Sequence, residues 1–417
     1  MAGQRQTPGR SATSWGAIMI ATIALPRLMR VGAGASAELG NILSQLGLSR
    51  PLIVTDKHLV ELGKLEKLMG SLDSSKVRAT LFSDVVLDPT VASVEACLAF
   101  LRAGNYDCVV GFGGGSSMDT AKAVAVLAVH GGAMSSYKVP HIQDAPGLPI
   151  IAIPTTAGTG SETTRFTIIS DEKTNEKMLC IGLGFLPTAA LVDYEQSFTM
   201  PKGLTAATGL DALCHALEGY VSKKTHPFSQ NIATQAMRAI APNLRRAYAD
   251  PLDRYAREAV MLGASLAGIA FSNSSVALIH GMARPIGAFF HVAHGLSIAM
   301  LMPAVIEFTA PAAPELYAGA ARAMGLAVDG ESNESAVKKL VNEFIAFNQD
   351  LQVPTPKSYG INPDRWTQLL PTMAEQSIAS GSPGNNPRAA TAEQQVQLYK
   401  QAWAGEETRK LYKQAGA

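Results

Sequence analysis

The chain has 417 residues, of which 47% are hydrophobic and 17% are charged. This composition is typical of a globular protein, and the length is sufficient for two domains with substantial cores. Lys and Arg number 35 and Asp and Glu number 34, so the net charge is +1. The chain therefore shows neither the basic surface of a nucleic-acid binder nor an acidic tail.

The N-terminal segment superficially resembles a secretion signal, because basic residues precede an apolar run over residues 15–25. However, Pro26, Arg27 and Arg30 separate that run from the small residues at 35–37. We therefore interpret residues 1–14 as a loose tail and the next segment as a first strand. No apolar run approaches the roughly 20 residues that span a bilayer, so no membrane segment is expected.

The four cysteines, Cys97, Cys108, Cys180 and Cys214, form no Cys-x-x-Cys pair, and each has apolar neighbours. This pattern favours small buried side chains in a reducing compartment over a disulfide framework. We expect a cytoplasmic protein.

The first half of the chain alternates short apolar strands with helices. We expect strands at residues 52–56, 77–82, 108–112 and 149–154, and helices at 91–103 and 117–129. Such alternation predicts a largely parallel sheet with helices on both faces.

After Pro201 the pattern becomes helical. We expect helices at residues 206–222, 229–247, 255–270, 296–308, 311–324, 334–349 and 363–375. Pro311 suits a first helical turn, where a missing N–H costs nothing. We place a domain boundary within residues 193–201, which gives an α/β domain over 15–197 and an all-helical domain over 198–417. Residues 380–388 are expected to form a loop.

A glycine-rich turn, Gly111-Phe112-Gly113-Gly114-Gly115-Ser116-Ser117, follows a predicted strand and opens a predicted helix. Glycines let the backbone approach an anion, and the helix N-terminus directs free N–H groups at it. The ordinary alternative is a plain glycine turn. The strand–glycine–helix context favours phosphate binding.

An earlier strand ends at Thr55-Asp56. An acidic residue at this position accepts hydrogen bonds from an adenosine ribose and repels a 2′-phosphate, which favours NAD over NADP. An Asp at a strand end is also a common helix cap, so both interpretations stay open for Asp56.

A second loop of small residues, Pro154-Thr155-Thr156-Ala157-Gly158-Thr159-Gly160-Ser161-Glu162, follows the strand predicted at 149–154. Its hydroxyls and glycines suit close packing against a nucleotide. A Thr-rich turn without a ligand explains this loop equally well.

Asp211 and His215 are four residues apart, so on a helix they share one face and can present an oxygen and a nitrogen to one metal ion. His280 and His294 are fourteen apart, which on one straight helix is roughly 21 Å at about 1.5 Å per residue. Ligand bonds of about 2 Å cannot bridge that gap, so the chain must turn back. We assign the breaks to Pro285, Gly287 and Gly295. Spacing alone does not separate this site from ordinary buried histidines.

The motifs described above have the order and spacing of those in the iron-containing (group III) alcohol dehydrogenases, which this chain resembles. The resemblance covers this chain from about residue 21 to about residue 406. The motifs that carry the resemblance are Gly-Gly-Gly-Ser-x-x-Asp at 113–119, Pro-Thr-Thr-Ala-Gly-Thr-Gly-Ser-Glu at 154–162, Gly-x-Asp-Ala-x-x-His-Ala-x-Glu at 209–218, and the paired His280 and His294.

The resemblance implies an α/β nucleotide-binding domain followed by an all-helical domain, a dehydroquinate synthase-like fold, with a metal in the cleft between them. It implies that the metal ligands are Asp211, His215, His280 and His294. It also implies that NAD contacts Asp56, Gly113, Gly114, Gly115, Ser116, Asp119, Thr155, Thr156, Thr159 and Lys177. A homodimer is common in the family.

The chain departs from the family at one position. Many members carry a second His four residues after the first cleft histidine, and here that residue is Arg284. On a helix Arg284 would lie one turn from His280, beside the metal. We hypothesise that its planar guanidinium group recognises a carboxylate or another anionic or polar substrate group. A structural ion pair is the equal alternative. His291 is a candidate for proton transfer in place of the missing His.

The expected reaction is hydride transfer between NAD and an alcohol, aldehyde or ketone whose oxygen binds the metal as a Lewis acid. Three His and one Asp suit Fe(II) and Zn(II) alike, and the family favours iron. The alternatives are maleylacetate-type reduction of an acid, another reaction such as a lyase on the same scaffold, and a non-catalytic binding protein. A phosphate substrate would call for several cleft Lys and Arg, whereas only Arg284 lies near the metal motifs. We expect a small-molecule substrate and no nucleic-acid or membrane partner.

Overall fold

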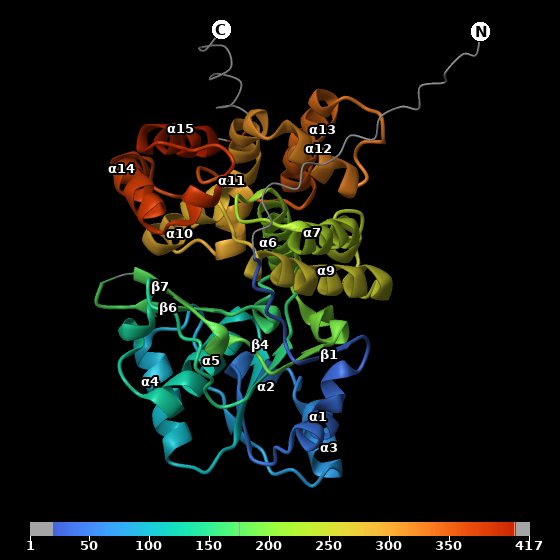
Figure 1. Cartoon of the computed structure of the whole chain (residues 1–417), viewed down its shortest axis with the longest axis vertical. Helices are drawn as coiled ribbons and strands as arrows, with labels where there is room; N and C mark the ends of the chain where they lie inside the picture. The colour runs from blue at the N-terminus through green and yellow to red at the C-terminus, as the bar shows by residue number, and fades with distance from the viewer. Residues whose placement is uncertain (1–19, 175, 404, 406–417) are drawn as a thin grey trace, which may run out of the picture.

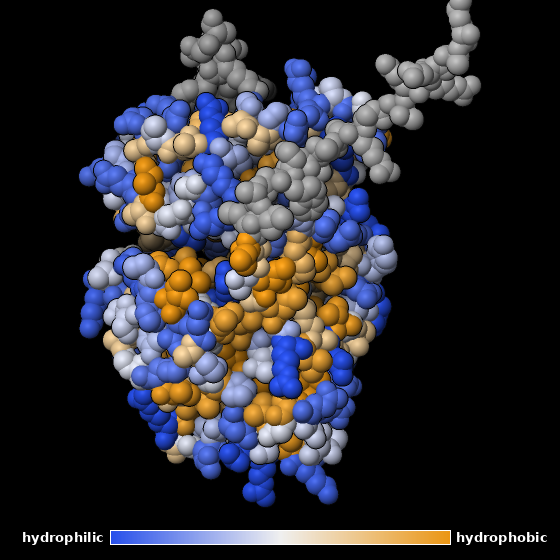
Figure 2. Space-filling model, viewed as in Figure 1, coloured by the Kyte–Doolittle hydropathy of each residue, from blue (hydrophilic) through white to orange (hydrophobic). Residues whose placement is uncertain are grey.

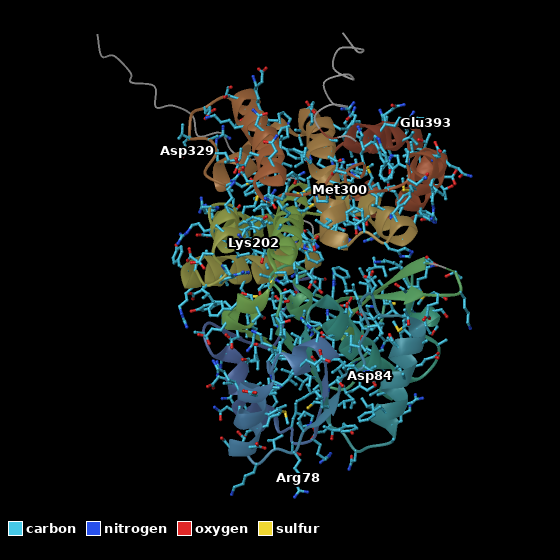
Figure 3. The ribbon with its side chains drawn as sticks, turned by 180° about the vertical axis from the view of Figure 1, so that it is seen from behind. Arg78, Asp84, Lys202, Met300, Asp329 and Glu393 are labelled. Carbon is cyan, nitrogen blue, oxygen red and sulfur yellow. The ribbon has the colours of Figure 1, made fainter. Side chains whose placement is uncertain are left out.

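The computed structural model describes residues 20–174, 176–403 and 405. Figure 1 shows two stacked parts: an α/β part that contains the main sheet, and a part built only of helices. This order confirms the predicted fold class. Figure 3, from the opposite side, places Asp84 in the α/β part and Lys202, the first residue of α6 (Lys202–Val221), in the helical part.

The described residues of the α/β part form a six-stranded sheet in the order β1-β8-β5-β4-β2-β3, with every neighbouring pair parallel. The strands are β1 (Leu28–Val31), β2 (Pro51–Val54), β3 (Thr80–Phe82), β4 (Cys108–Gly113), β5 (Ile150–Pro154) and β8 (Ala189–Val192). The predicted strands at 52–56, 77–82, 108–112 and 149–154 correspond to β2, β3, β4 and β5. Parallel strands that are buried on both faces have nearly continuous apolar sequences, and for this reason these four could be predicted.

Side chains that alternate along each strand enter two separate cores. Leu52 and Val109 join one core, beneath α4 (Val91–Arg102) and α5 (Gly115–His130). Ile53 and Val110 join the other, beneath α1 (Leu39–Leu46) and α3 (Glu66–Ser74). The helices are α1 (Leu39–Leu46), α2 (Lys57–Glu61), α3 (Glu66–Ser74), α4 (Val91–Arg102) and α5 (Gly115–His130). Helices therefore cover both faces of the sheet, as predicted.

An antiparallel hairpin of β6 (Phe166–Asp171) and β7 (Glu176–Ile181) forms a second, smaller sheet. This hairpin was not predicted, because the alternation of apolar and polar residues in its strands is weak. A tertiary contact helps to fix it: the backbone N–H of Ile168 donates to the carboxylate of Asp119, at 2.9 Å. In Figure 1 the hairpin lies at the boundary between the two parts, on the side of α10 (Leu278–Phe290).

The helical part begins after the 3₁₀ turn at Tyr194–Thr199. Its helices are α6 (Lys202–Val221), α7 (Pro227–Ile240), α8 (Leu244–Ala249), α9 (Arg254–Ser272), α10 (Leu278–Phe290), α11 (His294–Thr309), α12 (Pro314–Ala323), α13 (Asn333–Asp350), α14 (Pro363–Ala379) and α15 (Ala392–Trp403). The residues between β8 and α6 include the predicted boundary at 193–201. The division into residues 15–197 and 198–417 stays a prediction.

Three expectations about elements were wrong. Residues 20–25 form no strand; the first strand is β1, and Ile20 is 99% exposed. The single helix expected at 229–247 is two helices, because Pro242, between α7 and α8, cannot donate a backbone hydrogen bond. Pro311 lies in a short 3₁₀ turn, and Pro314 occupies the first turn of α12 instead. The proposed tail at 1–14 lies outside the described residues.

The segment His294–Ala312 is long and apolar enough to pass as a membrane span by length and composition, contrary to the sequence analysis. However, 67% of its most apolar window is buried inside the protein. It packs against α6, α10 and α13, so its apolar character is that of an interior helix.

Candidate active site between the sheet and the helices

A cleft of about 690 Å³ lies between the two parts, and residues from both parts line it. Figure 2 shows a hollow in the surface at the boundary between the upper and lower parts. The predicted site residues that line the cleft are Asp56, Gly114, Gly115, Ser116, Asp119, Thr155, Thr156, Thr159, Lys177, Asp211, His215, His280, Arg284 and His294. Gly113 and His291 are not among the lining residues.

The glycine turn lies at the carboxyl ends of the central strands, where open parallel sheets bind their ligands. Gly114 precedes α5 without any side-chain cap, so the first N–H groups of this helix remain available to an anion. Gly113 has a φ of +149°, and a Cβ there would lie 2.4 Å from Ser117 Oγ. Gly113 therefore allows the turn, and Gly114 and Gly115 face the cleft.

The threonine loop packs directly beside the glycine turn, because Pro154 pairs with Gly113 in the β4–β5 register. The backbone N–H of Thr155 donates to the Gly113 carbonyl at 2.9 Å. A Cβ on Gly115 would come within 3.0 Å of Thr159 Cγ2. The two loops thus form one surface of small side chains and backbone amides.

Asp56 and Asp119 both make protein contacts in addition to lining the cleft. Asp56 caps α2, because its carboxylate accepts from the N–H of Leu59 at 3.0 Å. Asp119 accepts from Ser161 Oγ at 2.8 Å and from Ile168 N at 2.9 Å. Asp119 therefore ties α5 to the threonine loop and the hairpin, and its contact with the cofactor stays a prediction.

Asp211 and His215 share one face of α6, as their spacing predicted, while His280 comes from α10 and His294 begins α11. Asp211 Oδ1 lies 3.8 Å from His215 Nε2, 3.5 Å from His280 Nε2 and 3.7 Å from His294 Nε2. The ligand atoms of Asp211, His215 and His280 thus lie within 4.8 Å of one another, and His294 joins them through its approach to Asp211.

These distances fit a metal ion better than direct hydrogen bonds. Ligand atoms about 2.1 Å from one tetrahedral ion lie about 3.4 Å apart. Asp211 Oδ1 and His280 Nε2 are buried and have no hydrogen-bond partner among the described residues. Buried polar atoms are rarely left unpaired, so a bound ion accounts for both.

The protonation states of the cluster also suit a cation. Burial lowers the pKa of His215 to about 3 and that of His294 to about 4, so both rings are neutral ligands at pH 7. Burial alone would raise the pKa of Asp211, but the surrounding His residues lower it well below its usual value. One carboxylate and neutral imidazoles would leave a divalent ion with net positive charge.

Access to the cluster is one-sided. The side chain of His294 is 36% exposed, whereas those of His215 and His280 are 6% and 4% exposed. Phe271 stacks on His215, with ring centroids 4.2 Å apart. The cluster is therefore closed by protein on one side and reachable from the cleft on the side of His294.

Glu218 supports the cluster; it ends the motif at 209–218, but no role was predicted for it. Its carboxylate is buried and lies 2.7 Å from His280 Nδ1, and it accepts from the backbone N–H groups of Ala277 and Ile279 at 2.7 and 2.6 Å. A hydrogen bond from Nδ1 fixes the tautomer that presents Nε2 to Asp211. The helical spacing from Asp211 and His215 was the available signal for this residue.

The assignment of the chain reversal to Pro285, Gly287 and Gly295 was wrong, because the first two lie inside α10 and Gly295 lies inside α11. The helix ends instead at His291, which has a left-handed φ of 53°, and α11 begins at His294. Packing of α10 against α11 and α14 stabilises it despite the proline. The predicted reversal itself is present, since the rings of His280 and His294 are 5.5 Å apart.

His291 is exposed at the C-terminal end of α10, so the geometry does not favour its predicted role in proton transfer. Arg284 faces the cleft one turn after His280. Lys177 reaches the cleft from β7 and forms an ion pair with Asp88 at 3.0 Å.

Two family models match the chain. The first, iron-containing alcohol dehydrogenase, matches residues 26–194, and the second, the C-terminal region of the Fe-containing alcohol dehydrogenase family, matches residues 205–403. The chain belongs to the iron-containing alcohol dehydrogenase family. This confirms the resemblance drawn from the motifs.

Relatives and solved structures agree with the family assignment. The lactaldehyde reductase of Escherichia coli K12 is 35% identical over 89% of this chain and 97% of its own length. The NAD-dependent methanol dehydrogenase of Bacillus methanolicus is 34% identical over 91% and 98%. The crystal structure of a 1,3-propanediol oxidoreductase superposes with a TM-score of 0.88 at 32% identity, covering 92% of this chain and all of that one.

The family identifies the chain as an oxidoreductase that interconverts alcohols with aldehydes or ketones. This confirms the predicted class of reaction over the lyase and the non-catalytic binding protein.

Proposed function

We propose that the chain uses NAD and a divalent metal, Fe(II) in the native enzyme, to oxidise small alcohols and reduce small aldehydes or ketones in this cleft. The observation that carries the proposal is the convergence of Asp211, His215, His280 and His294 around atoms that otherwise lack partners. Zn(II) is the alternative, because the ligand set suits both ions.

Asp211, His215, His280 and His294 would hold the metal. When bound, the ion would supply a Lewis acid that polarises the substrate oxygen. The protein contributes the arrangement of this site: Glu218 orients His280, Phe271 covers His215, and the exposed edge of His294 leaves the substrate side open.

The glycine turn and the threonine loop would hold NAD, with its phosphates at the uncapped N-terminus of α5. The nicotinamide carries the hydride. We assign contacts with NAD to Asp56, Gly113, Gly114, Gly115, Ser116, Asp119, Thr155, Thr156, Thr159 and Lys177. The carboxylate of Asp56 would favour NAD over NADP, because it accepts from a ribose hydroxyl and repels a 2′-phosphate.

The proposal is tested by reconstitution. Protein purified without oxygen is stripped of metal, reloaded with Fe(II) or Zn(II), and assayed for NADH oxidation with acetaldehyde, butanal and acetone. We expect turnover that depends on the added metal and is faster with Fe(II). A folded, metal-loaded protein that binds NADH but reduces none of a broad carbonyl panel would contradict the proposal.

We further propose that the chain works as a homodimer in the cytoplasm. β1 is an edge strand of the sheet, and apolar side chains at and before it are exposed: Ile20, Ile23, Leu25 and Val31. Figure 2 shows a broad apolar area on this face. Edge strands and exposed apolar surface favour self-association. Light scattering should give twice the mass of the 417-residue chain, and a monomeric mass at micromolar concentration would contradict the dimer.

A further inference from the structure

Arg284 has an unusual environment for a cleft arginine. It lies one helical turn after His280 on α10 and is only partly exposed. No described residue forms a hydrogen bond or an ion pair with its side chain. By contrast, the guanidinium of Arg257, buried in the same part, donates to the Pro251 carbonyl and to Thr205 Oγ1.

The carboxylate whose charge acts on Arg284 already has other partners. Glu218 is the carboxylate whose charge acts on Arg284, but it is held by His280 and two backbone N–H groups. Arg284 therefore brings a positive charge and up to five N–H donors into the cleft without a protein acceptor. Leaving such a group partly desolvated and unpaired costs free energy, which an anionic ligand would offset.

A second cation lies near the same face of α10. Gly287 follows Arg284 by three residues, and a Cβ on Gly287 would lie 3.8 Å from Lys177 Nζ. Arg284, Lys177 and His294 all line the same cleft. The two positive charges therefore lie on the side of the metal cluster where His294 is exposed to the cleft.

From this arrangement we propose that Arg284 is a specificity-determining residue that binds a carboxylate on the substrate. The proposal rests on the proposed function, because the carbonyl of the same substrate must reach the metal cluster. It names the substrate class as small aldehydes or ketones with an acidic group, such as aldehyde acids. A guanidinium binds a carboxylate through two parallel N–H···O bonds, which also fixes the orientation of the carbonyl.

The test compares substrates that differ only in charge. NADH-dependent reduction of 4-oxobutanoate is measured against butanal, and that of glyoxylate against acetaldehyde, in wild type, Arg284→Ala and Arg284→Lys. In Arg284→Ala, we expect the ratio of kcat/KM for the acid to kcat/KM for the neutral partner to fall about 30-fold or more for at least one pair. In Arg284→Lys, the same ratio should fall less, since lysine keeps the positive charge but lacks the paired N–H donors of the guanidinium.

Arg238→Ala is the matched control, because Arg238 is exposed on α7 and does not line the cleft. Its ratio should equal that of wild type. Metal content and the Kd for NADH are measured for each variant.

Two outcomes would overturn the assignment of Arg284. In one, the acid-to-neutral ratio is the same in wild type and Arg284→Ala. In the other, Arg284→Ala weakens NADH binding and lowers activity with all aldehydes alike, which would make Arg284 a cofactor contact. In both, turnover of neutral aldehydes by wild type would leave the proposed function intact, whereas absence of all NADH oxidation would contradict that function itself.

Discussion

The Nδ1 atom of His280 lies 2.7 Å from a carboxylate oxygen of Glu218, and Nε2 of the same ring lies 3.5 Å from Asp211 Oδ1. The contact between Nδ1 and Glu218 therefore leaves Nε2 as the ring nitrogen that faces the centre of the cluster. Because Glu218 is itself held by two backbone N–H groups, the ring has little freedom to rotate.

Glu218→Gln is expected to weaken metal binding. The glutamine retains the shape of the side chain but loses the charge, and its NH₂ group cannot accept from the donors that now hold Glu218. Loss of such a partner typically costs about 10- to 100-fold in metal affinity. Competition with a chelator measures the affinity, and Glu258→Gln, at an exposed position on α9, is the control. An unchanged metal Kd would show that Glu218 is dispensable for orienting His280.

Asp56→Asn should relax the preference for NAD. Asparagine still accepts from the N–H of Leu59 and so keeps the cap of α2, but it no longer repels a 2′-phosphate. We expect the ratio of kcat/KM with NADH to kcat/KM with NADPH to fall roughly tenfold, the size of one partly screened charge repulsion. Asp253→Asn, which alters the cap of α9 away from the cleft, should leave the ratio unchanged. An unchanged ratio in Asp56→Asn would show that Asp56 only caps α2 and does not select between NADH and NADPH.

Gly268→Ala is expected to destabilise the junction between the threonine loop and α9. A Cβ at Gly268 would lie 2.3 Å from Thr163 Oγ1 and 2.7 Å from the Gly160 carbonyl oxygen. Such overpacking typically costs about 1–3 kcal/mol in the free energy of unfolding. Gly70→Ala is the control, because nothing lies within 4 Å of its added Cβ in α3, and it should stabilise the chain by about 0.5–1 kcal/mol. Urea denaturation measures both, and equal stabilities would contradict the packing argument.

The thiols of the native enzyme should resist modification. All four cysteines are free and buried, and burial raises the pKa of Cys97 and that of Cys180 to about 12. Because the thiolate is the reactive form, a disulfide reagent at pH 8 should modify almost no thiol in the folded protein. In guanidinium chloride it should modify all four. Rapid modification of the native protein would show that a cysteine is more accessible than its burial indicates.

The strands β2, β3, β4 and β5 and most long helices could be predicted from the sequence, because their patterns of apolar residues are those of buried strands and helix faces. The four-residue strand β8 was not predicted. The hairpin β6–β7 could not be predicted, since Asp119 and the adjoining helix help to fix it rather than its own pattern. The first strand was misplaced because residues 20–25 are apolar but run along the surface.

The metal ligands could be predicted as a set from their motifs, but the path of the chain between them could not. Pro285 normally indicates a helix break, yet buried packing keeps α10 intact, and the reversal depends on the left-handed conformation of His291. The helical spacing places Glu218 on the same side of α6 as Asp211 and His215, but its contact with His280 is a tertiary property that no local pattern contains. The same holds for the lack of a partner for Arg284.

The most direct test is to measure how much metal wild type, His280→Ala and His130→Ala bind. Each protein is titrated with Fe(II) in the absence of oxygen. Elemental analysis then gives the number of ions per chain, and NADH oxidation gives the activity. His130 is exposed at the end of α5, outside the cleft, and serves as the control. We predict about one ion per chain and metal-dependent turnover for wild type and His130→Ala, and loss of both in a folded His280→Ala. Full metal binding and turnover in His280→Ala would contradict the assignment of this cluster as the active site.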